Sequence, residues 1–210
     1  MFILDIILSI TNNIITALYQ YLWISLIVAF LISTCYLFVY EKNEQGQGIR
    51  KTIELWFLTF RSSAAFRILF FLCFYVAMIL FRTVLNRSLW HNPLNDLFGG
   101  WWIYRTDSNG ELVLTTECLE NIVLFIPFSF LSLWFLVKKQ RCVKIGGLVL
   151  KNIRLALYLT LIIEFSQLFL RVGTFQISDI VYNALGGITG TLLFLMCYGI
   201  YHKIKKREVF

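Results

Sequence analysis

The sequence predicts an all-α fold, a polytopic bundle of transmembrane helices with about five spans. Of its 210 residues, 59% are hydrophobic and only 15% are charged, whereas a soluble domain carries about 25% charged residues. The charges lie mostly between apolar runs, and a run of about 18 or more apolar residues is long enough to cross a bilayer as a helix. These observations favour one lipid-embedded protein over a soluble domain with an anchor.

Five apolar runs are candidate spans, and we expect them at residues 17–40, 66–85, 121–137, 148–170 and 180–201. Residues 1–16 are apolar but contain Asp5, Asn12 and Asn13, so they are either a short interfacial helix or the front of the first span. We expect residues 55–64 to form a helix on the membrane surface. The chain therefore divides into an N-terminal part, 1–65, and a transmembrane domain, 66–210.

The loops predict the orientation of the bundle. The segment 138–154 holds six basic residues and no acidic one, and the tail after residue 201 is also basic, whereas the segment 86–120 holds five acidic residues and two basic ones. Cytoplasmic loops of membrane proteins are enriched in Lys and Arg. We therefore expect the N-terminus outside and the C-terminus in the cytoplasm. Within 86–120, the turn sequence from Asp107 to Gly110 predicts a short hairpin.

The charge and the metal-ligating residue types exclude several function classes. The formal net charge is +7, but the basic residues lie just outside apolar runs, so we expect membrane lipids and no nucleic acid as partners. The five cysteines include no C-x-x-C pair, and the two histidines have no ligand-like neighbour at helical spacing. We expect no bound metal and no cofactor, and the pattern leaves the oligomeric state open.

A polar cluster is predicted inside the membrane, on the fourth and fifth spans. Glu164, Gln167 and Arg171 are three and four residues apart, so they share one face of a helix. A carboxylate near the middle of a span costs roughly 2.5–3.5 kcal/mol, so Glu164 needs a partner, either Arg171 or a residue of the next helix. Asp179 and Asn183 share a face of that next helix, and the short connection predicts a tight hairpin that brings both sets together near the outer leaflet.

Other residues are candidates for packing or for the same site. Gly186 and Gly190 form a pair of small residues that permits close helix contact. Pro127 interrupts the third span, where it predicts a packing kink, and Asn121 begins that span. Arg82 either extends its guanidinium to the interface or completes the cluster as a second cation. The cluster itself has two interpretations, a ligand or substrate site and a structural pin between helices.

Three segments together resemble the VanZ-like family, bacterial membrane proteins named for a teicoplanin-resistance protein. They are NIVLFIPFSF at 121–130, IEFSQLFLRVG at 163–173 and ISDIVYNALGGITG at 177–190. The positions that match the family pattern are Asn121, Pro127, Glu164, Gln167, Arg171, Asp179, Asn183, Gly186 and Gly190. The resemblance covers about residues 66–200, and the outer loop at 91–98 matches only loosely.

The resemblance implies a multi-pass protein of the bacterial plasma membrane. It also implies an association, in the namesake of the family, with lower susceptibility to teicoplanin-type glycopeptides or lipoglycopeptides. The outward-leaning polar cluster leads us to expect a lipid-linked or glycopeptide ligand at the outer leaflet. The alternative is an intramembrane enzyme that acts on a lipid or a lipid-linked cell-wall headgroup, with Glu164 or Asp179 as general base.

Overall fold

The computed structural model describes residues 2–41, 48–85, 92–102, 104–106, 110, 112–140 and 144–207. Within these residues the regular elements are helices, apart from one two-stranded hairpin, and loops connect them. The elements are α1 (Phe2–Tyr36), a π-helical turn (Leu37–Glu41), α2 (Ile49–Ser62), α3 (Ala64–Leu80), a second π-helical turn (Phe81–Leu85), β1 (Tyr104–Thr106), β2 (Leu112–Leu114), α4 (Glu117–Lys139), α5 (Ile145–Leu170) and α6 (Ile177–Arg207).

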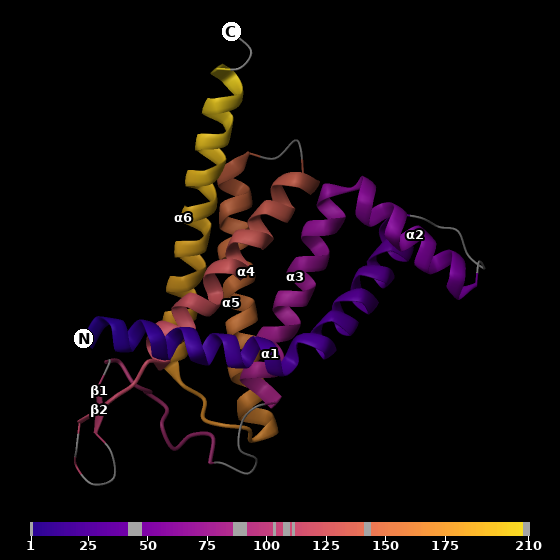
Figure 1. Ribbon diagram of the computed structural model, residues 1–210. Helices are drawn as coiled ribbons and strands as arrows, with labels where there is room; N and C mark the ends of the chain where they lie inside the picture. Colours follow the sequence, from indigo (N-terminus) through magenta and orange to yellow (C-terminus); the bar gives the residue numbers. More distant parts are fainter. Residues whose placement is uncertain are drawn as a thin grey trace.

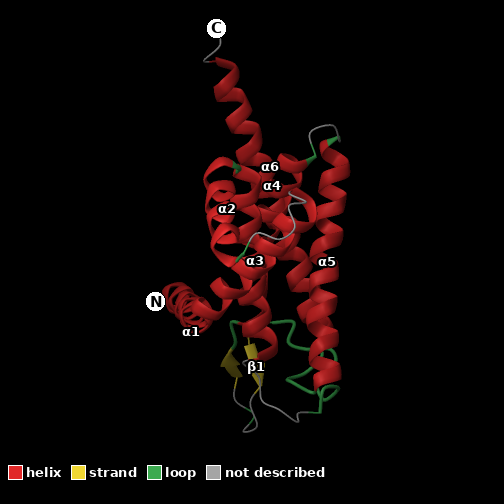
Figure 2. Ribbon diagram, turned by 90° about the vertical axis from the view of Figure 1, so that its right-hand side faces the viewer, coloured by secondary structure: helices red, strands yellow, loops and turns green. Residues whose placement is uncertain are grey.

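Five of these helices are long and apolar enough to cross a membrane, which confirms the predicted number of spans. The segments are Gln20–Val39, Ala64–Val84, Glu117–Lys139, Ile145–Leu170 and Ile177–Ile204. They pack side by side, with the loops that carry the hairpin at one end of the bundle and the C-terminus at the other (Figures 1 and 2). We call the hairpin end, where residues 92–102 and 171–176 lie, the loop end.

The first helix is longer than its span. α1 covers 35 residues, and its N-terminal half runs across the loop end before the helix bends upward along α3 (Figure 1). The apolar segment at 1–16, from residue 2 onward, therefore belongs to the part of α1 that lies across the bundle, as an interfacial helix would lie.

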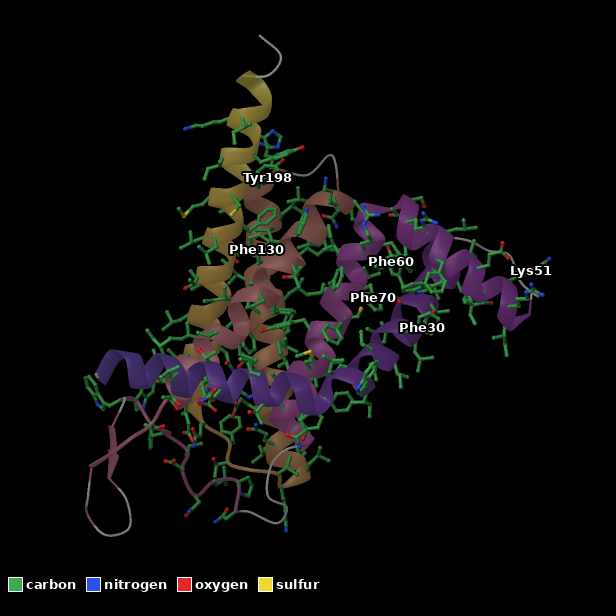
Figure 3. All side chains as sticks on the ribbon, viewed as in Figure 1. Phe30, Lys51, Phe60, Phe70, Phe130 and Tyr198 are labelled. Atoms are coloured by element: carbon green, nitrogen blue, oxygen red, sulfur yellow. The ribbon has the colours of Figure 1, made fainter. Side chains whose placement is uncertain are left out.

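The second helix begins earlier than predicted, at Ile49, and it lies at the side of the bundle, beside the ends of α1 and α3 that are far from the loop end (Figure 1). Its Trp56 is buried and packs against rings of α1, α2 and α3, with centroid distances of 5.0 Å to Phe30, 4.9 Å to Phe60 and 5.4 Å to Phe70 (Figure 3). The indole Nε1 donates to Ser33 Oγ at 2.9 Å. These contacts bind α2 to the first two spans.

The C-terminal helix, α6, packs mainly against α4, although α5 directly precedes it in the chain. A Cβ atom added at Gly186 or Gly190 would lie 2.2 Å from the carbonyl oxygens of Ile122 and Ile126, respectively. The glycine pair is therefore a helix-packing site, and its partner is the backbone of α4. Pro127 lies inside α4, and one turn earlier the carbonyl oxygen of Leu124 accepts a hydrogen bond from Tyr75 Oη at 2.9 Å.

The loop end is ordered by backbone hydrogen bonds between distant segments. β1 and β2 pair in antiparallel register, with Arg105 opposite Val113, which confirms the predicted hairpin. The N–H groups of Phe175 and Ile177 donate to the carbonyls of Pro93 and Leu97 at 2.8 and 3.0 Å. The connection between α5 and α6 is therefore fixed to the loop that follows α3.

Candidate functional site

Arg82 forms an ion pair with Glu120 at the loop end. Arg82 lies in the π-helical turn that ends α3, and Glu120 lies in the first turn of α4. The distance from Arg82 Nη2 to Glu120 Oε2 is 2.5 Å, and the two side chains are only 19% and 11% exposed. The second carboxylate oxygen of Glu120 accepts a hydrogen bond from Thr116 Oγ1 at 2.5 Å. A carboxylate at a helix N-terminus is also favoured by the helix dipole.

Gln167 joins α5 to the same π-helical turn. Its side chain is buried, and Nε2 donates to the backbone carbonyl of Thr83 at 2.9 Å. Thr83 follows Arg82 directly, so Gln167 lies beside the turn that carries the guanidinium. Single π-helical turns within helices often occur at functional sites.

Glu164 lies one turn before Gln167 on the same face of α5, farther from the loop end, and is 1% exposed. Its Oε2 accepts a hydrogen bond from the backbone N–H of Gln176 at 2.9 Å. The Gln176 side chain in turn donates to Asp96 Oδ2 at 3.2 Å and to Thr174 Oγ1 at 3.1 Å. The buried carboxylate is therefore held by the loop that connects α5 to α6, and this loop also contacts the loop after α3.

Asn183 of α6 completes the group at its inner side. It is 4% exposed, and its Nδ2 donates to Thr160 Oγ1 at 2.9 Å. Thr160 is four residues before Glu164, on the same face of α5. We refer to the group as the polar cluster, and its members are Arg82, Glu120, Glu164, Gln167, Gln176 and Asn183.

Four buried polar atoms at this end have no hydrogen-bond partner among the described residues. They are Arg82 Nη1, Gln167 Oε1, Ser178 Oγ and Asn183 Oδ1. Buried polar groups in proteins are nearly always paired with protein, water or a ligand, so such atoms call for an explanation. They offer a cationic donor, two amide acceptors and a hydroxyl to a molecule that reaches the cluster.

A second polar group lies deeper in the bundle and has a different character. Asn152 of α5 is fully buried, and its Nδ2 donates to the Ser129 carbonyl at 3.0 Å and to Thr191 Oγ1 at 2.9 Å. Its Oδ1 accepts a hydrogen bond from Ser132 Oγ. Asn152 therefore joins α4, α5 and α6 with every polar atom of its own side chain paired.

The structure brings together only some of the residues predicted from the sequence. Glu164, Gln167 and Asn183 lie in the polar cluster, and Arg82 lies next to Thr83, whose carbonyl accepts the hydrogen bond from Gln167. Asp179 lies in the first turn of α6 and is half-buried, and Asn121 follows Glu120 in α4 and is also half-buried.

Arg171 does not lie in the polar cluster, contrary to the prediction. It is exposed, and it ends α5 in a left-handed backbone conformation with φ 53° and ψ 43°. The predicted one-face relation with Gln167 requires the helix to continue through residue 171, but α5 ends at Leu170. The side chain therefore leaves that face, and the cation of the cluster is Arg82.

Three cluster contacts were not predicted from the sequence. The sequence places Glu120 only in an acidic loop, although its position directly before an apolar run indicates that it can lie at the start of a helix. Thr160 was also detectable, because it lies four residues before Glu164 on one helix face. Gln176 acts partly through its backbone N–H, and residue type gives no signal for that contact. The described residues contain no group of three or more His, Cys, Asp or Glu side chains arranged to hold a metal ion.

Comparison with known proteins places the chain in a family. The VanZ/LLP1 family matches residues 18–198, so the match includes the first span, which the motif resemblance left out. No curated protein and no solved structure matches the chain. Because the match covers most of the 210 residues, the chain belongs to the VanZ/LLP1 family.

Proposed function

We propose that this protein lies in the bacterial plasma membrane and binds a lipid-linked cell-wall headgroup or a glycopeptide at the polar cluster. Through this binding it lowers susceptibility to teicoplanin-type glycopeptides. The observation that carries the proposal is the set of buried polar atoms that lack a partner in the described part of the chain, with Arg82 Nη1 as the charged member. Each such atom costs about 1–3 kcal/mol when it is left unpaired, and a bound headgroup that supplies partners recovers this cost.

The proposal requires the loop end to face outward. The ends of α4 and α5 that flank the basic segment, and the basic C-terminal end of α6, lie opposite the hairpin (Figure 1), which supports this orientation. A Gly110→Cys variant in intact cells should react with a membrane-impermeant maleimide above the wild-type background. A Lys138→Cys variant should react only after the cells are opened, and the reverse pattern contradicts the orientation.

The test of function is the susceptibility of a teicoplanin-sensitive bacterial host. Expression of the wild-type chain should raise the inhibitory concentration of teicoplanin. The Gln167→Met variant should lose this effect at equal protein level in the membrane, because methionine keeps the shape of glutamine but offers no amide. Lys138→Gln, at the opposite end of the bundle, is the control and should behave as wild type. If deletion and overexpression both leave susceptibility unchanged, the resistance proposal fails.

The second candidate function is an intramembrane enzyme, and the burial of Glu164 favours it. Glu164 is 1% exposed, and the backbone N–H of Gln176 orients its carboxylate. A general base that acts on a lipid-linked headgroup would need to be held in this way. Purified Glu164→Gln protein should then keep its thermal stability and lose turnover of such a substrate. A loss of folded protein in place of turnover would make Glu164 a structural residue.

A further inference from the structure

The hydrogen-bonding pattern of the polar cluster indicates which part of a headgroup it contacts. Resting on the proposed function, we propose that the cluster recognises the hydroxyl groups of a glycosyl headgroup and not its phosphate. The proposal is carried by four observations: the kinds of atom that lack a partner, the charges around them, the length of the cluster, and the aromatic side chains at the loop end.

The atoms without a partner among the described residues include more acceptors than donors. Gln167 Oε1 must be an acceptor, because Nε2 is committed to donating to the Thr83 carbonyl. Asn183 Oδ1 is also an acceptor, Ser178 Oγ can donate or accept, and Arg82 Nη1 can only donate. Sugar hydroxyls both donate and accept, so they can satisfy all four atoms. A phosphodiester has no donor and would leave both amide oxygens unpaired.

The charges of the cluster act against a strong anion. Glu120 and Glu164 are both buried, and Asp96 reaches the cluster through Gln176. The described ion pair of Arg82 is with Glu120, so the carboxylate already neutralises part of the charge of the guanidinium. Repulsion between like charges is strong in a medium of low dielectric constant, and a neutral polyhydroxyl group avoids it.

The cluster is also elongated. Gln167 marks its outer end and Thr160, which binds Asn183, marks its inner end. The two residues are seven positions apart on one face of α5, which corresponds to about 10 Å along the helix axis. A sugar headgroup can reach both ends, whereas a single small ion contacts one end only.

Aromatic side chains lie at the loop end, between the start of α6 and the loop after α3. The hydroxyl of Tyr182 donates to the carbonyl of Trp101 at 2.8 Å, and the two rings are 6.1 Å apart. Trp101 is 43% exposed. The negative face of an aromatic ring attracts polarised C–H groups, which line the faces of a sugar ring.

The test uses phosphatidylcholine nanodiscs that contain the full chain and one of three probes with identical acyl chains. The probes are monoglucosyl diacylglycerol, phosphatidylmethanol (a phosphodiester without a hydroxyl group) and diacylglycerol, and native mass spectrometry measures which lipid remains bound to the protein. The glucosyl lipid should be retained at least about tenfold more strongly than either other probe. Competition by methyl glucoside in solution would support the same chemistry with a free sugar as its source.

Two variants and a matched control locate the binding. Gln167→Met and Asn183→Leu each remove an amide acceptor and should weaken retention of the glucosyl lipid about tenfold. Asn152→Leu removes a buried amide whose polar atoms are all paired within the bundle, so it should keep wild-type retention in its folded fraction. Equal weakening by all three variants, measured on folded protein, overturns the proposal.

The outcomes separate this inference from the proposed function. Equal or stronger retention of phosphatidylmethanol overturns recognition of hydroxyl groups, and the function then stands if expression still raises the inhibitory concentration of teicoplanin. Selective retention of the glucosyl lipid without any change in susceptibility supports the site and removes the resistance role.

Discussion

The two ends of the bundle are held together in different ways. At the end away from the loops, where α2 packs beside α1 and α3, Trp56 lies among the rings of Phe30, Phe60 and Phe70, and its one polar group is paired with Ser33. At the loop end, the polar cluster joins α3, α4, α5 and α6 through charges and amides, and several of its atoms lack a partner in the described chain. The polar group of the aromatic packing is therefore paired within the bundle, whereas the polar cluster has hydrogen-bonding groups that another molecule can pair.

The largest expected effect comes from breaking the ion pair. Arg82→Leu should destabilise the protein by about 3–5 kcal/mol, because it leaves the sheltered Glu120 carboxylate without its guanidinium. Thermal unfolding in detergent measures the loss as a lower Tm. The double variant Arg82→Leu with Glu120→Leu should recover much of it, since no charge is then left uncompensated. A double variant as unstable as the single one would show that the pair is not the source of the effect.

The next effect tests the contact between α4 and α6. Gly190→Ala should cost about 1–3 kcal/mol, because its Cβ would lie 2.2 Å from the Ile126 carbonyl oxygen and the helices must separate. Gly199→Ala in the same helix is the matched control, since nothing lies within 4 Å of its added Cβ. The control should be neutral or stabilising by up to about 1 kcal/mol. Equal Tm values for the two variants would contradict the close packing.

The smallest effect is expected at the aromatic end. Trp56→Phe should cost about 1 kcal/mol, because it removes the hydrogen bond to Ser33 and leaves that buried hydroxyl without its donor while most of the ring packing remains. Trp134→Phe, where the side chain is 39% exposed, should leave Tm nearly unchanged. A loss at Trp56 as large as that at Arg82 would remove the distinction between the two ends.

The spans could be predicted from the sequence because a bilayer imposes length and hydropathy on every crossing helix. The site could be predicted only in part. Glu164 and Gln167 follow from helical spacing, but Arg171 does not, because α5 ends one residue before it and the left-handed turn redirects its side chain. The prediction extended helical geometry past the end of the helix.

The pairing of Arg82 with Glu120 depends on two helix ends that meet in space. Hydropathy places such ends only to within a few residues, and here α4 begins at Glu117 rather than at residue 121. Those four residues move Glu120 from a loop into the bundle. The π-helical turn that presents Arg82 and the Thr83 carbonyl has no comparable signal in residue type.

The hydrogen bonds that fasten the loop end also set an order of assembly. Asp96 meets Gln176 across 80 residues of chain, and Gln167 meets Thr83 across 84. At a synthesis rate of about 5–20 residues per second, the earlier partner waits roughly 4–17 s for the later one to be made. The loop after α3 is thus made well before α5 and α6 exist to receive it. During biogenesis the groups on the loop after α3 and on the π-helical turn therefore wait without Gln176 and Gln167, and the polar cluster is complete only after α6 has been made.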